Sequence, residues 1–169
     1  MSLYPVPPQA HLAAVPSGVA GVQVTLKAMV RLVRHWRKDA GMVKLARSIV
    51  QPLPGKDFRG EIDRLFCWTK QHIRYVQDVN QVETLATPRA TLEMRSGDCD
   101  EMATLLATLL EAIGHPARFV AMGFNQDLYS HVIVETRLGS RWLACDTTEA
   151  AARVGWTPPN KTRLMVAHV

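Results

Sequence analysis

The sequence predicts an α+β fold in which N-terminal helices, among them a central helix that carries a cysteine, pack on an antiparallel β-sheet. Apolar residues recur at helical spacing through the first two thirds of the 169 residues. Strand-like segments follow in the last third, and the two-residue turn Gly139-Ser140 separates two of them. Helices that precede antiparallel strands are typical of α+β proteins.

The first 77 residues are predicted to hold an arm and three helices. Residues 1–21 are rich in proline, alanine and glycine, so we expect an extended or flexible N-terminal arm there. Residues 22–169 suit a single domain with its own core. Apolar periodicity places helices at about 24–38, 39–50 and 58–76, and a proline pair separates the second from the third.

The next segment leads into the most informative helix. Residues 77–95 show no clear period and contain Pro88, so we expect a long ordered loop, a kind of segment that often serves function. Asp98 is then a good N-cap, with Glu101 three residues later in capping-box position. A wide apolar stripe continues to Gly114, a residue type that commonly ends helices, and predicts a buried, central helix.

The remaining residues are predicted to form strands at 117–124, 131–138 and 141–147, and the tail 162–169 could add another. If Gly139 and Ser140 are the turn residues, position 138 pairs with 141, and 133 pairs with 146. His131 and Asp146 then lie diagonally on one face of the hairpin, about 7–8 Å apart at the backbone. A turn longer or shorter by one residue would place them on opposite faces.

Three cysteines are present, Cys67, Cys99 and Cys145. Their odd number and the absence of a C-x-x-C pair argue against a disulfide framework or a zinc ribbon. We expect Cys67 and Cys145 to be small buried core residues. Cys99 differs, because it follows the predicted N-cap and should be the first helical residue.

The start of a helix suits a nucleophilic cysteine. Free backbone N–H groups there favour the thiolate and can bind an oxyanion. Asp98, Asp100 and Glu101 act in the opposite direction, so a nearby imidazolium would have to outweigh them. His131 and Asp146 can supply one. The sequence therefore predicts an acyl-transfer triad in which Cys99 attacks a carbonyl carbon, His131 accepts and returns the proton, and Asp146 orients the imidazole.

The segments around these residues resemble the three conserved blocks of the transglutaminase-like superfamily. Residues 96–101 match its G-D-C-D block, residues 130–135 its His-containing strand, and residues 142–148 its block of Trp, three residues, Asp and a nearby Thr. Residues 73–78 are similar to the I-x-Y-x-x-D piece of the family, and Pro88 falls where the family often has a proline. The resemblance covers about residues 60–150.

This resemblance implies a papain-like core with Cys99 as nucleophile, His131 as base and Asp146 as orienting residue. It implies thiol-dependent acyl transfer or hydrolysis on amide bonds of a protein or peptide, of peptidase, deamidase or transglutaminase type. The overall layout is similar to short phage and prophage members. One departure is that no side-chain oxyanion donor can be placed; Gln71 and Gln81 are the candidates.

Other functions are weaker alternatives. A metal site from Asp98, Asp100 and His131 has no ligand spacing to support it, so we predict no metal and no cofactor. The net charge is +5, and Lys27, Arg31, Arg34 and Lys38 form one basic helix stripe, which is either a solvated face or a site for an acidic assembly partner. No aromatic interleaving supports nucleic-acid binding.

The expected location is the bacterial cytoplasm, with virion association as an alternative. No apolar run is long enough to cross a membrane, and residues 1–21 lack a signal-peptide layout. The competing function is a non-catalytic scaffold or phage-assembly protein that keeps the fold but not the chemistry.

Overall fold

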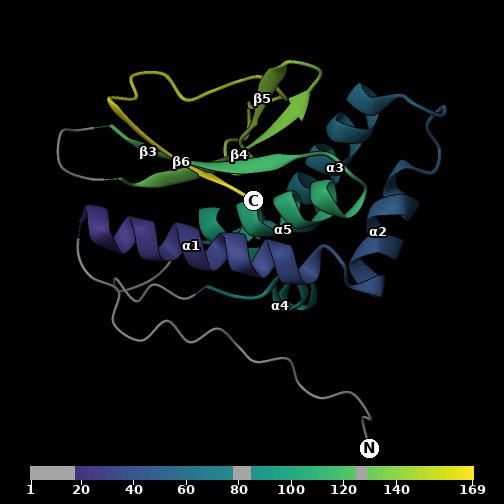
Figure 1. The fold of residues 1–169 in the computed structure, drawn as a ribbon, viewed down its shortest axis with the longest axis horizontal. Helices are drawn as coiled ribbons and strands as arrows, with labels where there is room; N and C mark the ends of the chain where they lie inside the picture. Colours follow the sequence, from purple (N-terminus) through teal and green to yellow (C-terminus); the bar gives the residue numbers. More distant parts are fainter. Residues whose placement is uncertain (1–17, 78–84, 125–128) are drawn as a thin grey trace, which may run out of the picture.

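The central helix of the molecule lies between an antiparallel sheet and a set of outer helices (Figure 1). A computed structural model describes residues 18–77, 85–124 and 129–169. The central helix, α5 (Cys99–Ala112), contacts β3 and β4 of the sheet on one side and every other helix elsewhere. Those helices are α1 (Val19–Trp36), α2 (Ala40–Val50), α3 (Phe58–His72) and α4 (Pro88–Met94).

The buried position of α5 follows from its sequence. All residues from Glu101 to Leu110 are buried, including four leucines, because the helix is covered on every side. Around it, α1 and α2 present one apolar face each, as the 3.6-residue periodicity predicts. The predicted α+β class and the central cysteine-bearing helix are therefore confirmed.

The main sheet has the strand order β5-β4-β3-β6, and all neighbours are antiparallel. The expected C-terminal strand is confirmed, since it pairs with β3 at one edge. The β4–β5 hairpin has the predicted register, in which Leu138 pairs with Arg141 and Val134 with Cys145. Gly139 has φ 60°, as the first residue of a two-residue hairpin turn requires. The strands are β3 (Ala117–Gly123), β4 (His131–Leu138), β5 (Arg141–Cys145) and β6 (Arg163–His168).

The segment before α5 differs from the prediction in two respects. The third helix ends at His72 and not at 76, because β1 (Arg74–Tyr75) pairs in parallel with β2 (Ser96–Gly97). The expected loop at 77–95 contains α4, whose N-cap Thr87 accepts a hydrogen bond from the Ala90 N–H at 3.2 Å. Proline at the first helical position was the signal for this helix, and it favours a helix start as much as a loop.

The N-terminus shows one further difference. Helix α1 begins at Val19, so the last three residues of the predicted arm are helical. Residues 1–17 lie outside the described residues, and the arm stays a prediction there, as does the single-domain boundary. None of the helices in the described parts of the chain is long and apolar enough to cross a bilayer.

Candidate active site

A capping box fixes the start of α5 and thereby the position of Cys99. The Oδ1 atom of Asp98 accepts hydrogen bonds from the backbone N–H groups of Asp100 (2.8 Å) and Glu101 (3.2 Å). In return, the Glu101 Oε2 atom accepts one from the Asp98 N–H at 2.8 Å. These reciprocal bonds confirm the predicted capping box and make Cys99 the first residue of the helix.

Glu101 also ties the helix start to the segment before α4. Its side chain is 4% exposed, and its Oε1 atom accepts a hydrogen bond from the Ala86 N–H at 3.1 Å. Burial, with the Asp98 carboxylate beside it, raises the pKa of Glu101 to about 8. Gly97 passes so close to this side chain that an added Cβ would lie 2.7 Å from the Glu101 Cβ atom. A glycine is therefore required there by close approach and not by backbone angle.

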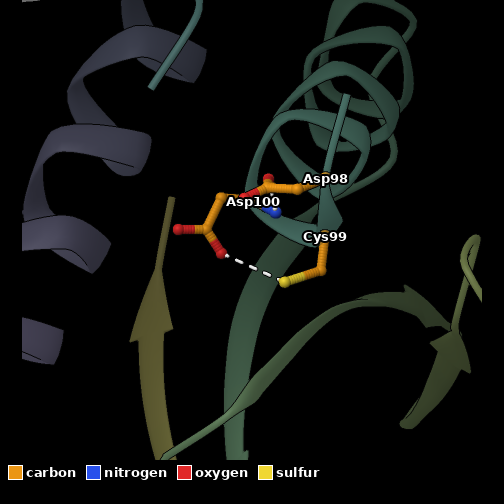
Figure 2. A group of neighbouring side chains, drawn as sticks. All are labelled: Asp98, Cys99 and Asp100. Atoms are coloured by element: carbon orange, nitrogen blue, oxygen red, sulfur yellow. Dashed lines mark hydrogen bonds between the residues drawn. The ribbon is translucent and has the colours of Figure 1, made fainter. Parts of the chain in front are cut away.

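The Cys99 thiol rests in its protonated form. It donates a hydrogen bond to the Asp100 Oδ1 atom at 3.5 Å (Figure 2). Burial raises the pKa of Cys99 well above its ordinary value, and the charges of Asp100 and Asp98 raise it further. A hydrogen bond from the Val132 backbone N–H lowers this pKa in part. That contact places the sulfur against the strand residue that follows His131.

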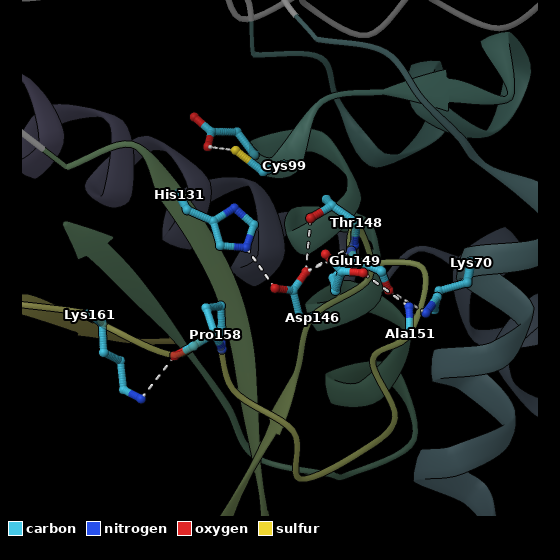
Figure 3. Close-up of polar contacts among 10 residues, drawn as sticks. Lys70, Cys99, His131, Asp146, Thr148, Glu149, Ala151, Pro158 and Lys161 are labelled. Atoms are coloured by element: carbon cyan, nitrogen blue, oxygen red, sulfur yellow. Dashed lines mark hydrogen bonds and ion pairs between the residues drawn. The ribbon is translucent and has the colours of Figure 1, made fainter. Parts of the chain in front are cut away.

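His131 and Asp146 meet as the hairpin register predicts. His131 lies at the first position of β4, and its Nε2 atom is 2.8 Å from the Asp146 Oδ2 atom (Figure 3). Asp146 follows directly after β5 and is 1% exposed. The two side chains thus reach across the diagonal of the hairpin and form a hydrogen bond. A one-residue slip of the turn would have separated them.

The second oxygen of Asp146 is occupied as well. Its Oδ1 atom accepts hydrogen bonds from the Thr148 N–H (3.0 Å), the Thr148 hydroxyl (2.9 Å) and the Glu149 N–H (3.3 Å). Burial alone would raise the pKa of Asp146, but the bonds from His131 and Thr148 outweigh it and hold that pKa below its ordinary value. Asp146 is therefore a carboxylate at neutral pH, fixed in place by its neighbours.

Cys99 and His131 line the same cavity, which has a volume of about 260 Å³. Asp98 and Asp100 form part of its polar wall, and α1 supplies an apolar wall through Val22, Leu26 and Met29. Further polar groups in the lining belong to Thr25, Tyr75, Gln77, Tyr129 and Ser130. The cavity therefore brings the thiol, the imidazole and the start of α5 together.

Sequence reasoning missed two residues that line the cavity, Tyr75 in β1 and Gln77 two residues later. Tyr75 and Gln77 alternate along an extended segment, so both side chains face the cavity, while the Val76 N–H donates to the Gly97 carbonyl at 2.9 Å. Gln71, a candidate oxyanion donor, lies instead on α3 and lines a separate groove between α2 and α3. Gln81, the other candidate, lies outside the described residues. Alternation after Ile73 was the signal that could have found Gln77.

The other cysteines show one correct and one wrong prediction. Cys145 is buried, as expected. Cys67 is exposed, because the buried face of α3 is formed by Ile62, Leu65, Phe66 and Thr69, and Cys67 falls outside it. Apolar neighbours in sequence had suggested burial, but helical geometry turns Cys67 towards solvent. The three cysteines are free.

Asp98, Cys99 and Asp100 are the one group of described residues with the spacing of metal ligands, since one ligand atom from each lies within 4.8 Å of the others. His131, which the sequence-based alternative included, is not a member of this group. The Asp98 carboxylate caps α5, and Asp100 accepts the thiol hydrogen bond. Each of the three side chains therefore also takes part in a contact within the protein.

Comparison with solved structures identifies proteins of the same fold. Legionella pneumophila LapG matches with a TM-score of 0.54 and 16% identity, over 79% of this chain and 80% of LapG. A candidate cysteine protease from Cytophaga hutchinsonii matches with a TM-score of 0.54 and 17% identity, over 84% of this chain. A candidate protease from Parabacteroides distasonis has a TM-score of 0.57 at 13% identity, over 76% of this chain.

The chain spans 55% of the Cytophaga protein and 27% of the Parabacteroides protein. No curated protein matches the sequence. A family model, the transglutaminase-like superfamily, matches residues 43–147, which include Cys99 and the β4–β5 hairpin. The resemblance of the three sequence blocks is thereby confirmed, and the chain belongs to the transglutaminase-like superfamily.

Proposed function

We propose that this protein is a cysteine-dependent enzyme that hydrolyses or transfers acyl groups of amide bonds in proteins or peptides, with Cys99, His131 and Asp146 as its triad. The observation that carries the proposal is the shared cavity of Cys99 and His131, with Asp146 hydrogen-bonded to the far side of the imidazole. The family and the protease-like neighbours favour the same class of enzyme.

The imidazole has one nitrogen for each partner. If the Nε2–H group donates to the Asp146 carboxylate, Nδ1 is the acceptor. Figure 3 places this second ring nitrogen on the side of His131 that lies towards Cys99. The thiol would rotate from Asp100 towards His131 and transfer its proton to Nδ1 as the sulfur attacks the carbonyl carbon. Asp146 would then stabilise the imidazolium.

The tetrahedral intermediate needs donors for its oxyanion. The Cys99 N–H is at the first position of α5, where helical bonds leave it free, and the Gln77 amide lines the same cavity. Collapse of the intermediate would break the C–N bond, and the imidazolium would give its proton to the leaving amine. Water or a second amine would then attack the thioester, so hydrolysis and transfer share one acyl-enzyme.

Alkylation tests the nucleophile, provided that the exposed Cys67 is removed first. In a Cys67→Ser background, we expect iodoacetamide near neutral pH to label Cys99 and Cys99→Ala to abolish labelling and turnover. Incubation of a casein substrate with a fluorescent primary amine separates transfer from hydrolysis, because only transfer attaches the amine to protein. An unreactive Cys99 in the folded protein, at every pH from 6 to 9, would refute the proposal.

A second candidate is a scaffold or phage-assembly function, carried by a basic stripe that begins on α1 and ends at Lys38, two residues beyond the helix. Lys27, Arg31, Arg34 and Lys38 are all exposed, and none forms a salt bridge to another described residue. Residues 19–50 contain seven Lys or Arg residues and one Asp, a net charge of +6, although the whole chain has only +5. Such a face suits an acidic partner in the cytoplasm or a virion.

Complex formation separates this candidate from the enzyme. The scaffold would be favoured if the protein turned over no amide substrate but bound a host or phage protein. That binding should survive Cys99→Ala and be lost in the Arg31→Glu and Arg34→Glu double variant. The reverse pattern would favour the enzyme, because nothing in binding through α1 requires an ordered His131–Asp146 pair.

A further inference from the structure

Lys70 makes an unusual set of contacts at the C-terminal end of α3. Its Nζ atom donates hydrogen bonds to the backbone carbonyls of Glu149 (2.6 Å), Ala150 (3.0 Å) and Ala152 (2.9 Å). An ammonium group has three N–H donors, so each has a carbonyl partner. These three carbonyls are more than 75 positions away from Lys70 along the chain. The side chain therefore fastens a distant segment to α3.

The fastened segment is the one that holds Asp146. Residues 146–152 contain neither a helix nor a strand, and apart from the backbone bond from the Ala152 N–H to the Glu149 carbonyl (3.1 Å), the hydrogen bonds described for them involve side chains. Glu149 joins the two ends: its N–H donates to Asp146 at 3.3 Å, and its carbonyl accepts from Lys70. Thr148, the neighbouring residue, donates twice to the same Asp146 oxygen. A continuous chain of contacts thus runs from Lys70 through Glu149 to Asp146 and His131 (Figure 3).

We propose that Lys70 is a positioning residue for the triad. The ammonium draws three carbonyl dipoles to one point, and this holds the Thr148 and Glu149 donors where they fix the Asp146 carboxylate. Asp146 in turn sets the orientation of the His131 ring. The inference rests on the proposed function, because its consequence for turnover requires that His131 act as the base.

Loss of the ammonium is expected to loosen the segment and not to abolish the fold. The Ala150 and Ala152 carbonyls would turn to water, whereas the Glu149 carbonyl would keep its bond from the Ala152 N–H (3.1 Å). The Gly155 N–H bond to the Ala144 carbonyl (2.7 Å) and the Arg59 contact to the Val154 carbonyl (3.4 Å) would still anchor the next residues. Asp146 would keep its bond to His131 only part of the time. Displacement of a catalytic group by about 1 Å can cost up to a hundredfold in rate.

The test compares Lys70→Met with a matched control, Lys161→Met. Lys161 also binds this part of the chain, through the Thr157 hydroxyl and the Pro158 carbonyl, but away from Asp146. We expect Lys70→Met to lower kcat/KM by about tenfold to a hundredfold, mainly through kcat. It should also displace or broaden the NMR signal of the His131 Nε2–H proton. Lys161→Met should change neither quantity by more than twofold.

The NMR signal distinguishes this inference from the proposed function. If the wild-type protein has no turnover, a displaced His131 signal in Lys70→Met still supports the positioning role, and an unchanged signal overturns it. The inference is also overturned if Lys70→Met folds and its kcat/KM and His131 signal are the same as those of Lys161→Met. Should Lys70→Met fail to fold, Lys70→Gln decides in the same way, because the amide lacks the charge and has only two N–H donors for three carbonyls. Wild-type values overturn the inference, and a displaced signal supports it.

Discussion

The two sides of the cavity are prepared for chemistry to different degrees. On the hairpin side, Asp146 is a buried carboxylate whose two oxygens are both occupied, and it holds His131 in one orientation. On the helix side, the Cys99 thiol donates to Asp100, and burial and two carboxylates raise its pKa. The same residue type, aspartate, therefore fixes the imidazole on one side and disfavours the thiolate on the other. In the proposed mechanism the base is ready at rest, and the nucleophile is activated only when its proton moves to His131.

The largest effect is expected from Asp146→Asn on the hairpin side. An amide can offer its N–H₂ group to His131 and so favour the wrong tautomer, which should lower kcat/KM by about 10³-fold to 10⁴-fold. Thr148→Val is the matched control, since it removes only the hydroxyl that donates to Asp146 at 2.9 Å. It should weaken transition-state stabilisation by about 1 kcal/mol or less. Steady-state kinetics with one peptide substrate would measure both. An Asp146→Asn enzyme with a tenth of wild-type activity would contradict the assignment.

On the helix side, Gly97→Ala should destabilise the protein by about 1–3 kcal/mol, because the new Cβ overlaps the Glu101 side chain at 2.7 Å. Gly55→Ala is the control, since nothing lies within 4 Å of an added Cβ there. Urea unfolding of the two variants would compare their free energies of unfolding. Equal values would mean that the start of α5 adapts more easily than this contact suggests.

Asp100→Asn should reverse part of the difference between the two sides. Removal of one negative charge and of the thiol's acceptor lowers the pKa of Cys99, so more thiolate is present at pH 7. A fall of one pKa unit would raise the iodoacetamide rate by about tenfold. The measurement uses the Cys67→Ser background, with Glu93→Gln as an exposed control far from the cavity. A slower or unchanged rate would show that Asp100 does not hold the thiol protonated.

A further expected effect concerns the pH dependence of stability. The pKa of Glu101 is raised to about 8 by burial, above an unfolded value of about 4.3. The native state therefore binds more protons between these values, and the free energy of unfolding should fall as the pH rises from about 5 to 8. Glu101→Gln should flatten this slope. Urea unfolding at four pH values would test it, and identical slopes in both proteins would exclude Glu101 as the cause.

Local contacts explain why much of the fold, and the positions of the three residues of the proposed triad, could be predicted. The capping box at Asp98 and Glu101 joins residues three apart, and the Gly139-Ser140 turn sets the register of its two flanking strands. Both are decided by hydrogen bonds between near neighbours, so residue types at fixed spacing specify them. Cys99 as the first residue of α5, and His131 and Asp146 on one face, follow directly.

Only the tertiary structure decided what surrounds these residues. The pairing of Tyr75 with Gly97 brings Gln77 into the cavity, and Lys70 meets the carbonyls of residues 149–152 across the fold. The raised pKa of Cys99 depends on how deeply α5 is covered, which no short segment determines. Local patterns thus determine where Cys99, His131 and Asp146 lie in their elements. Their polar environment arises from contacts between distant residues, whose partners no spacing rule identifies.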